Sequence, residues 1–162
     1  MDDATTLCRS CGLCCTGHLF IWVKLRPAEL APAERLGLKV IRSHPNQRGF
    51  NQPCPMWQGN CRIYDLPAYP HACRAYNCKL LKDVIAERET LQHALTVVEQ
   101  TRELIREVAG LLPPSPKVSF RERLEDEMEG AHKDPQFQQK ASALLKAYEQ
   151  VFGVDDVVDM GE

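Results

Sequence analysis

Residues 8–15 of the chain read CRSCGLCC, which places four cysteines close together near the N-terminus. This spacing predicts metal ligation, because a C-x2-C turn brings two sulfurs to the same side of a tight loop, and Gly12 gives that turn its conformational freedom. All eight cysteines of the 162-residue chain lie in its first half. The candidate metal ligands are Cys8, Cys11, Cys14, Cys15, Cys54, Cys61, Cys73 and Cys78.

The pattern leaves the metal open between zinc and an iron–sulfur cluster. Paired cysteines separated by loops fit two zinc sites of four thiolates each, whereas three cysteines at successive x2 spacing fit a [4Fe–4S] cluster. Adjacent side chains point in different directions, so Cys14 and Cys15 are expected either to serve two neighbouring centres or to include one non-ligand. Structural zinc contributes an apparent binding free energy of about 10–16 kcal/mol. We therefore expect metal to decide whether this segment folds.

Structural disulfides and chemically inert buried cysteines are the alternatives to metal binding. The N-terminus, MDDATTLCRSCG, lacks the basic start and the apolar run of a secretory signal. A cytoplasmic location is therefore expected, and thiols there stay reduced. A cysteine–histidine nucleophile is a further alternative that nothing in the pattern favours.

Composition and charge exclude several classes of protein. With 44% hydrophobic and 26% charged residues the chain is not wholly disordered, and no run of about 18 apolar residues suggests a membrane span. Residues 1–81 hold ten Lys and Arg against five Asp and Glu, whereas residues 82–162 hold ten against seventeen. The basic residues are scattered singly, so they fit charge balance for thiolates better than nucleic-acid binding.

The chain is expected to form a cysteine-rich metal-binding domain over residues 1–81, a helical segment over 82–153 and a flexible tail over 154–162. In the first part, residues 18–25 read as a strand and residues 27–37 as a short helix. Residues 43–61 are turn-forming throughout. A loop-rich segment of this size is expected to bury little surface and to need metal to hold one structure.

In the second part, apolar residues recur every seven positions and predict one helix of about 28 residues that ends at Pro113. Ser119 and Glu122 form a capping-box pattern for a second helix, and Asp134 with Pro135 starts a third that Gly153 can end. The inner face of this third helix is expected to consist of Phe137, Ala141, Leu144, Leu145, Tyr148 and either Val151 or Phe152. We predict a mainly α fold with a small irregular, metal-stapled cysteine-rich domain, minor β structure and antiparallel C-terminal helices. The heptad stripe consists of Val84, Leu91, Val98, Ile105 and Leu112.

The same stripe admits a second interpretation, in which it is the seam of a coiled-coil homodimer or the binding face for another protein. Packing within the chain is the simpler interpretation. The two differ in whether Val98 is buried inside one chain.

The ordered motifs resemble those of the CxxCxxCC cysteine-cluster family, described as zinc- or iron-chelating domains. The resemblance covers about residues 7–81 and runs through CRSCGLCC, then QPCP at 52–55, CRIY at 61–64 and PHACRAYNC at 70–78. The family usually has arginine before the proline at position 70, where this chain has Tyr69. Relatives include the much longer flagellin lysine methylases, which use an iron–sulfur centre at their cluster cysteines. The resemblance implies metal binding and leaves the reaction undecided.

The sequence therefore predicts a cytoplasmic metal-binding protein, a structural or redox module that holds zinc or an iron–sulfur cluster. An iron–sulfur-dependent group-transfer enzyme and a zinc-stabilised protein-interaction module are the alternatives, so whether the chain is an enzyme stays open. His18 and His71 are expected near the site or on the surface rather than as ligands. Residues expected to balance thiolate charge or to pack around the site are Arg9, Arg62, Arg74, Tyr64, Tyr76 and Trp57.

Overall fold

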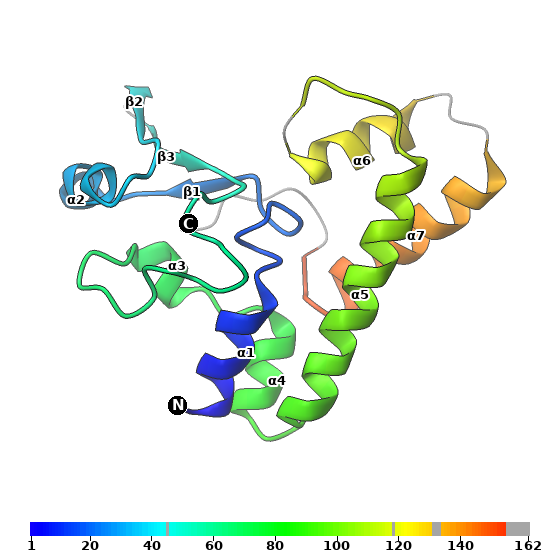
Figure 1. Ribbon diagram of the computed structural model, residues 1–162, viewed down its shortest axis with the longest axis horizontal. Helices are drawn as coiled ribbons and strands as arrows, with labels where there is room; N and C mark the ends of the chain where they lie inside the picture. Colours follow the sequence, from blue (N-terminus) through cyan, green and yellow to red (C-terminus); the bar gives the residue numbers. More distant parts are fainter. Residues whose placement is uncertain (45, 118, 131–133, 155–162) are drawn as a thin grey trace.

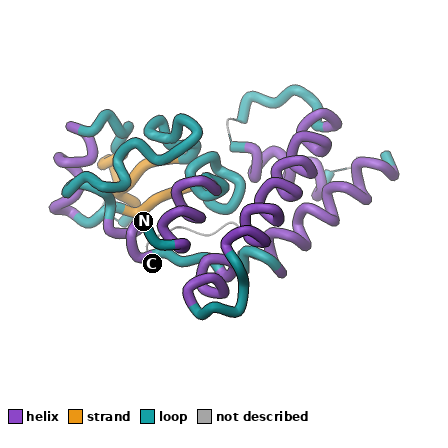
Figure 2. Tube along the Cα trace, turned by 60° about the horizontal axis from the view of Figure 1, so that its bottom comes forward, coloured by secondary structure: helices purple, strands orange, loops and turns teal. Residues whose placement is uncertain are grey.

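The computed structural model describes residues 1–44, 46–117, 119–130 and 134–154. The fold is mainly α with minor β structure, as the sequence predicts (Figures 1 and 2). The helices are α1 (Asp3–Cys11), α2 (Leu30–Arg35), α3 (His71–Ala75), α4 (Lys79–Ile85), α5 (Leu91–Leu111), α6 (Phe120–Glu129) and α7 (Pro135–Gln150), with a 3-10 turn over Pro27–Glu29. The strands are β1 (Trp22–Lys24), β2 (Ile41–His44) and β3 (Gln47–Asn51).

The antiparallel sheet has the order β1-β3-β2. Val23 lies opposite Phe50, and Ile41 lies opposite Gly49. A Cβ atom on Gly49 would stand 2.0 Å from the carbonyl oxygen of Val23, so only glycine permits this close approach of β1 and β3. The prediction that residues 43–61 only form turns is therefore wrong at its start, where a β-hairpin forms.

The two short elements predicted before this hairpin are present but reduced. The strand expected over residues 18–25 is limited to β1, and both Leu19 and Phe20 before it are 1% exposed, so the segment is covered on both sides. The helix expected over 27–37 begins as the 3-10 turn at Pro27 and continues as α2. Gly37 follows with a φ of 97°, which suits a glycine after a helix end.

The predicted helix of about 28 residues is wrong, because the chain breaks between α4 and α5. Glu87 lies in this break with a φ of 56°, in the left-handed region that cannot continue a helix. Thr90 then starts α5 as its N-cap, and its side chain accepts a hydrogen bond from the backbone N–H of His93 at 3.2 Å. The seven-residue repeat continues through the break, which is why periodicity alone did not reveal it.

The last two helices begin at the predicted caps. Ser119 accepts a hydrogen bond from the backbone N–H of Glu122 at the start of α6, and Asp134 accepts one from Gln136 at the start of α7. Figure 1 shows α7 returning along α5 in the opposite direction. The inner face of α7 is as predicted, since Phe137, Ala141, Leu144 and Tyr148 are fully buried.

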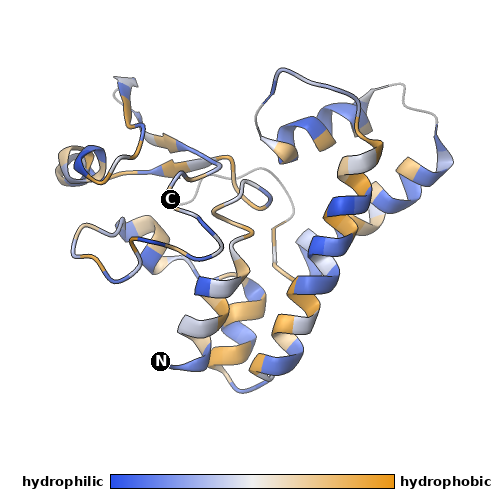
Figure 3. Cartoon of the chain, in the orientation of Figure 1, coloured by the Kyte–Doolittle hydropathy of each residue, from blue (hydrophilic) through white to orange (hydrophobic). Residues whose placement is uncertain are grey.

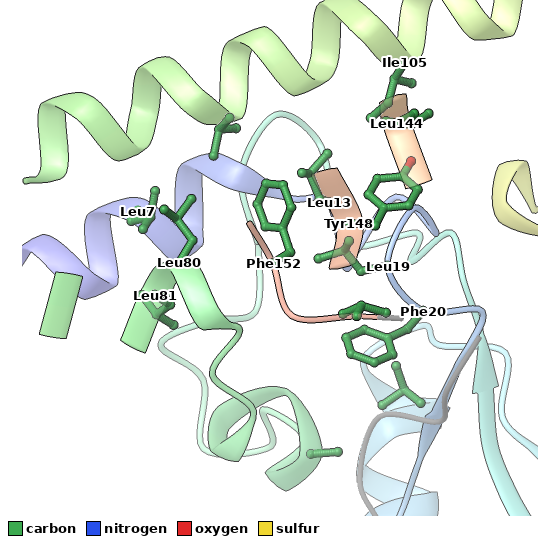
Figure 4. Close-up of a cluster of buried hydrophobic side chains, with 14 of the residues drawn as sticks. Leu7, Leu13, Leu19, Phe20, Leu80, Leu81, Ile105, Leu144, Tyr148 and Phe152 are labelled. Carbon is green, nitrogen blue, oxygen red and sulfur yellow. The ribbon is translucent and has the colours of Figure 1, made fainter. Parts of the chain in front are cut away.

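One hydrophobic cluster joins the cysteine-bearing segment to the helices (Figure 4). Leu7 of α1 lies near Leu80 and Leu81 of α4 in this view, and Phe152 lies between them and Leu13. Figure 3 shows hydrophobic colouring on α4 and on the part of α5 beside it. The prediction that residues 1–81 bury little surface is therefore wrong, because the segment shares its core with the helices that follow.

The apolar stripe of α5 also faces this core. Val98 is 1% and Ile105 is 8% exposed, so the middle of the stripe that would form a dimer seam is covered within the chain. Val154, assigned to the flexible tail, is only 3% exposed, and its backbone N–H donates to the carbonyl oxygen of Tyr148 at 2.8 Å. The rest of the predicted tail, residues 155–162, lies outside the described residues.

No helix within the described ranges combines the length and the apolar character that a membrane crossing requires.

Candidate functional site

Four of the eight cysteines lie on or beside α1 and α4. Cys8 and Cys11 are on α1, one helical turn apart, so this C-x2-C pair is helical and does not form the tight loop that the spacing predicts. Helix α1 ends at Gly12, and Cys14 lies in the turn that follows. Cys78 is the N-cap of α4. Because α1 packs against α4, these thiols come from both helices to one region.

The other four cysteines lie on short elements and turns. Cys15 follows Cys14, and its carbonyl oxygen accepts a hydrogen bond from the backbone N–H of Cys54 at 2.7 Å. Cys61 forms an isolated β-bridge with Trp57, and Cys73 is on α3. This backbone hydrogen bond brings the CRSCGLCC motif to the loop that carries Cys54.

Electrostatic interactions divide seven of the thiols into two sets, and Cys8 interacts with both sets. Burial raises the pKa of Cys14, and so do Cys78, Cys15, Cys11 and Cys8. Burial also raises the pKa of Cys15, as do Cys73, Cys54, Cys61 and Cys8. We name the first group, Cys8, Cys11, Cys14 and Cys78, the helical group, and the second, Cys15, Cys54, Cys61 and Cys73, the loop group.

Cys8, which we place in the helical group because it lies on α1, also interacts with the loop group. Burial raises the pKa of its thiol to about 11, and Cys78 of the helical group and Cys61 of the loop group raise it as well. The expectation that Cys14 and Cys15 serve two neighbouring centres, or that one of them is not a ligand, stays a prediction. All eight cysteines are free thiols, so structural disulfides are absent among them.

Backbone N–H groups point at several of the sulfurs. Cys78 accepts a hydrogen bond from the N–H of Leu81 at 3.4 Å. Burial raises the pKa of Cys54, whereas the N–H groups of Met56 and Trp57 lower it. At Cys11, Cys61 and Cys78, too, burial raises the pKa and backbone hydrogen bonds lower it. The donors are N–H groups two or three residues further along the chain. Such donors favour the thiolate, which is the form that binds metal.

Two arginines contribute positive charge to the site. Arg9, on α1, makes an ion pair with Asp65 at 2.8 Å, and its charge lowers the pKa of Cys61, which burial raises. Arg102, on α5, donates to the backbone carbonyl oxygens of Ser10 and Cys11 at 2.5 and 2.7 Å. It thereby satisfies carbonyl groups at the C-terminal end of α1, where a cation is also favoured by the helix dipole.

Two tyrosines lie among the thiols. Burial raises the pKa of the Tyr69 hydroxyl, and so do Cys73, Cys8, Cys61 and Cys15. The hydroxyl of Tyr69 therefore interacts with thiols of the loop group. The CxxCxxCC family usually has arginine at this position. Burial and the neighbouring Cys14 and Cys78 likewise raise the pKa of Tyr76, whose ring packs edge-on against Phe20.

The indole ring of Trp57 lies against Gly12 at the end of α1. A Cβ atom on Gly12 would stand 2.1 Å from Cζ2 of Trp57, and Gly12 has a φ of 64°. Both the indole ring and the backbone conformation therefore require glycine at this position. The sequence indicated the turn at Gly12 but not its contact with Trp57.

His18 and His71, the two histidines closest in sequence to the cysteines, form no metal-holding group with the thiols in the part of the chain that the structure describes. His71 is exposed, and its backbone N–H donates to Oε1 of Glu29 at 2.7 Å. His18 is partly buried, with Nδ1 3.3 Å from the hydroxyl of Tyr148 and its ring against Phe120. Burial lowers the pKa of His18 to about 4. His18 thus connects the segment after Cys15 to α6 and α7, a role that the sequence did not indicate.

The remaining arginines expected near the cysteines lie at the surface. Arg62 and Arg74 are both exposed, and the guanidinium of Arg74 lies 5.1 Å from the ring centre of Tyr69. Tyr64 stacks beside Tyr69 with 5.2 Å between the ring centres, and Arg9 lies over it. Arg102 is the residue near the site that the sequence did not indicate, because it acts through contacts 91 and 92 positions away in the chain.

A small cavity of about 50 Å³ lies beside the helical group. Cys8, Cys11, Cys14, Cys15 and Cys78 line it, together with apolar side chains such as Leu13 and Phe152. Within the described ranges, no three or more Cys, His, Asp or Glu side chains are arranged to hold a metal ion. Thiol donors fit a thiophilic metal such as zinc or iron. To coordinate one, the thiols would have to lie closer together than they do here.

No family model, no curated protein and no solved structure matches this chain. The resemblance to the CxxCxxCC family therefore stays a prediction from the motifs.

Proposed function

We propose that this protein binds metal through its eight cysteines, as zinc or as iron–sulfur clusters, in two neighbouring sites that correspond to the helical group and the loop group. One observation carries the proposal: the adjacent residues Cys14 and Cys15 face different thiols. Apart from each other and from Cys8, which interacts with both, Cys14 interacts with Cys11 and Cys78, whereas Cys15 interacts with Cys54, Cys61 and Cys73. The packing of α1 on α4 and the hydrogen bond from the backbone N–H of Cys54 to the carbonyl oxygen of Cys15 at 2.7 Å bring the elements that carry these thiols together.

The direction in which the thiol pKa values are shifted supports the same proposal. Burial raises the pKa of every cysteine in the two groups, so without metal the thiols stay neutral at neutral pH. A bound cation reverses this preference, because a coordinating thiol is deprotonated. The backbone donors at Cys54, Cys61 and Cys78 would then stabilise the thiolates.

The biological role that we propose is a structural or redox module in the cytoplasm. Eight free thiols suit a reducing compartment. The division into a metal-binding part over residues 1–81 and a helical part over 82–153 belongs to this proposal, although the two parts share one hydrophobic cluster.

Elemental analysis of protein purified without oxygen tests the proposal. We expect either two zinc ions per chain in a colourless protein, or iron and sulfide in a brown one. Replacing one thiol from each group, Cys11→Ser or Cys15→Ser, should remove about half of the metal. Ser10→Ala, a change of similar size beside Cys11 on α1, is the matched control and should keep all of it.

Two outcomes would contradict the proposal. One is protein that purifies folded and without metal under both oxygen-free and zinc-supplemented conditions. The other is a loss of metal in Ser10→Ala as large as in Cys11→Ser, since that would show that metal content follows the stability of α1 and not the thiol.

A further inference from the structure

The last carbonyl groups of α1 have their partner on α5. A helix leaves its last carbonyl oxygens without donors inside the helix. Here Nη2 of Arg102 donates to the carbonyl oxygens of Ser10 and Cys11, at 2.5 and 2.7 Å. Among the residues that the structure describes, no backbone N–H donates to either of these two oxygens. The position of this end of α1 therefore depends on a side chain more than 90 positions away in the chain.

The Arg102 side chain is itself held in place on α5. Its Nη1 atom donates to Oε2 of Glu99 at 3.3 Å, and the other carboxylate oxygen accepts a hydrogen bond from Arg106 at 3.2 Å. Arg106 makes its ion pairs with Glu99 and Glu103, which both lie on α5. The two arginines thus share one carboxylate, and Arg102 is the one that joins it to α1.

The thiols that follow the end of α1 are held by two different attachments. Cys11 is the last residue of α1, and the backbone oxygen of Cys11 is bound by Arg102. After the turn at Gly12, the carbonyl oxygen of Cys15 accepts a hydrogen bond from the backbone N–H of Cys54 at 2.7 Å. The first attachment lies on the side of the helical group, and the second lies on the side of the loop group. Loss of Arg102 therefore leaves the second attachment in place.

We propose that Arg102 is a positioning residue for the helical group, and that it raises the metal affinity of this group without changing that of the loop group. By holding the backbone of Cys11, it fixes where this thiol lies relative to the other three. Groups that orient metal ligands typically contribute a factor of about 10–100 to metal affinity. The inference rests on the metal binding that we propose above, and it makes α5 part of the control of that site.

Zinc binding to the full chain, reduced and freed of metal, tests the role of Arg102 in two cysteine backgrounds. Cys15→Ser leaves the helical group complete, and Cys11→Ser leaves the loop group complete. In the Cys15→Ser background, Arg102→Met should weaken zinc binding about tenfold. In the Cys11→Ser background the same change should leave the affinity unaltered. Competition with a chelator of known affinity measures both values.

Two further variants separate the position of Arg102 from its charge. Arg106→Met removes the same charge one helical turn further along α5 and is the matched control, so it should leave both affinities unaltered. Arg102→Lys keeps a charged group with N–H donors, so it should retain part of the affinity that Arg102→Met loses.

Hydrogen exchange gives a second readout that needs no metal. Without a partner for its last carbonyl groups, the end of α1 should open more often. Arg102→Met should therefore speed the exchange of the N–H groups over residues 9–16 by about fivefold, the effect of losing a typical hydrogen bond. The N–H groups of α7 should exchange as in the unchanged protein, and Arg106→Met should have no effect on residues 9–16.

Equal weakening of zinc binding in both cysteine backgrounds would overturn the role of Arg102, because a general loss of stability acts on both groups. So would exchange rates and affinities in Arg102→Met that match those in Arg106→Met. Absence of zinc binding in both backgrounds and in the unchanged chain is a different result, since it contradicts the proposed function and this inference together with it.

Discussion

The cysteine-bearing segment, residues 1–81, and the helical segment, residues 82–153, both contain fully buried apolar side chains but bury them by different means. In the helical segment, α5 and α7 are long, and each buries one regular stripe that includes Val108, Phe137 and Leu144. In the cysteine-bearing segment the helices and strands are short, yet Leu19, Phe20 and Val23 are at most 1% exposed.

The difference shows that the cysteine-bearing segment builds its core together with the helical segment. Helix α1 packs on α4 and α5, and the backbone N–H of Lys79 donates to the carbonyl oxygen of Phe152 at 3.0 Å. The short elements therefore fold against the helical segment. In our proposal metal adds to this shared core, and the thiols themselves remain only partly buried.

Metal removal should give the largest effect and should separate the two segments. If metal is bound as proposed, a chelator should expose the backbone of α1, α3 and the cysteine loops, because structural metal contributes about 10–16 kcal/mol. Helices α6 and α7 should keep their protection. Hydrogen exchange with mass spectrometry measures both, and equal loss of protection in all helices would show that the segments fold as one unit.

A methyl group at Gly12 should damage the cysteine-bearing segment most among single substitutions outside the thiols. Gly12→Ala places Cβ at 2.1 Å from Cζ2 of Trp57 at a φ of 64°, so we expect a loss of about 3 kcal/mol in the free energy of unfolding. Urea denaturation measures this loss.

Gly110→Ala is the matched control in the helical segment. A Cβ atom there meets nothing within 4 Å, so alanine should stabilise the last turn of α5 by up to about 1 kcal/mol. If both substitutions changed stability by the same amount, the contact between Gly12 and Trp57 would have no energetic weight.

The contact between His18 and Tyr148 should make the junction of the two segments sensitive to acid. Burial lowers the pKa of His18 from 6.5 to about 4. Between these values the unfolded chain binds more protons than the folded one, so stability is complete above pH 6.5 and falls as the pH decreases toward 4. Lowering the pH from 8 to 5 should reduce the free energy of unfolding by roughly 2 kcal/mol through this group.

Urea denaturation of the unchanged protein and of His18→Gln at both pH values isolates this contribution. Glutamine keeps a neutral polar group at the position and does not titrate, so the pH dependence of the variant should be smaller by that amount. An identical pH dependence in the two proteins would show that His18 is protonated in the folded state as readily as in the unfolded one.

The smallest expected effect concerns the break between α4 and α5. Thr90→Ala removes the side chain that caps α5, and we expect a loss of about 1 kcal/mol in the free energy of unfolding. Thr96→Ala, at an exposed position within α5, should cost nothing, because alanine favours a helix interior more than threonine does. Thermal unfolding of the two variants measures the difference, and equal melting temperatures would contradict the capping role of Thr90.

The sequence by itself determined the features that depend on near neighbours in the chain. Ser119 and Asp134 were identifiable as helix starts because a cap bonds to a backbone N–H two or three residues away. The inner face of α7 followed from its periodicity for the same reason. The eight cysteines were also identifiable as the candidate site from their spacing.

Only the tertiary structure decided what depends on distant partners. The pairing of β1 with β3, the division of the thiols between two groups and the contact of Arg102 with the end of α1 all join residues far apart in the sequence. His18 and Tyr148 are 130 positions apart, and no local pattern indicates that they meet. Local energies start a helix, whereas the packing of the whole chain selects which strands, thiols and buried polar groups meet.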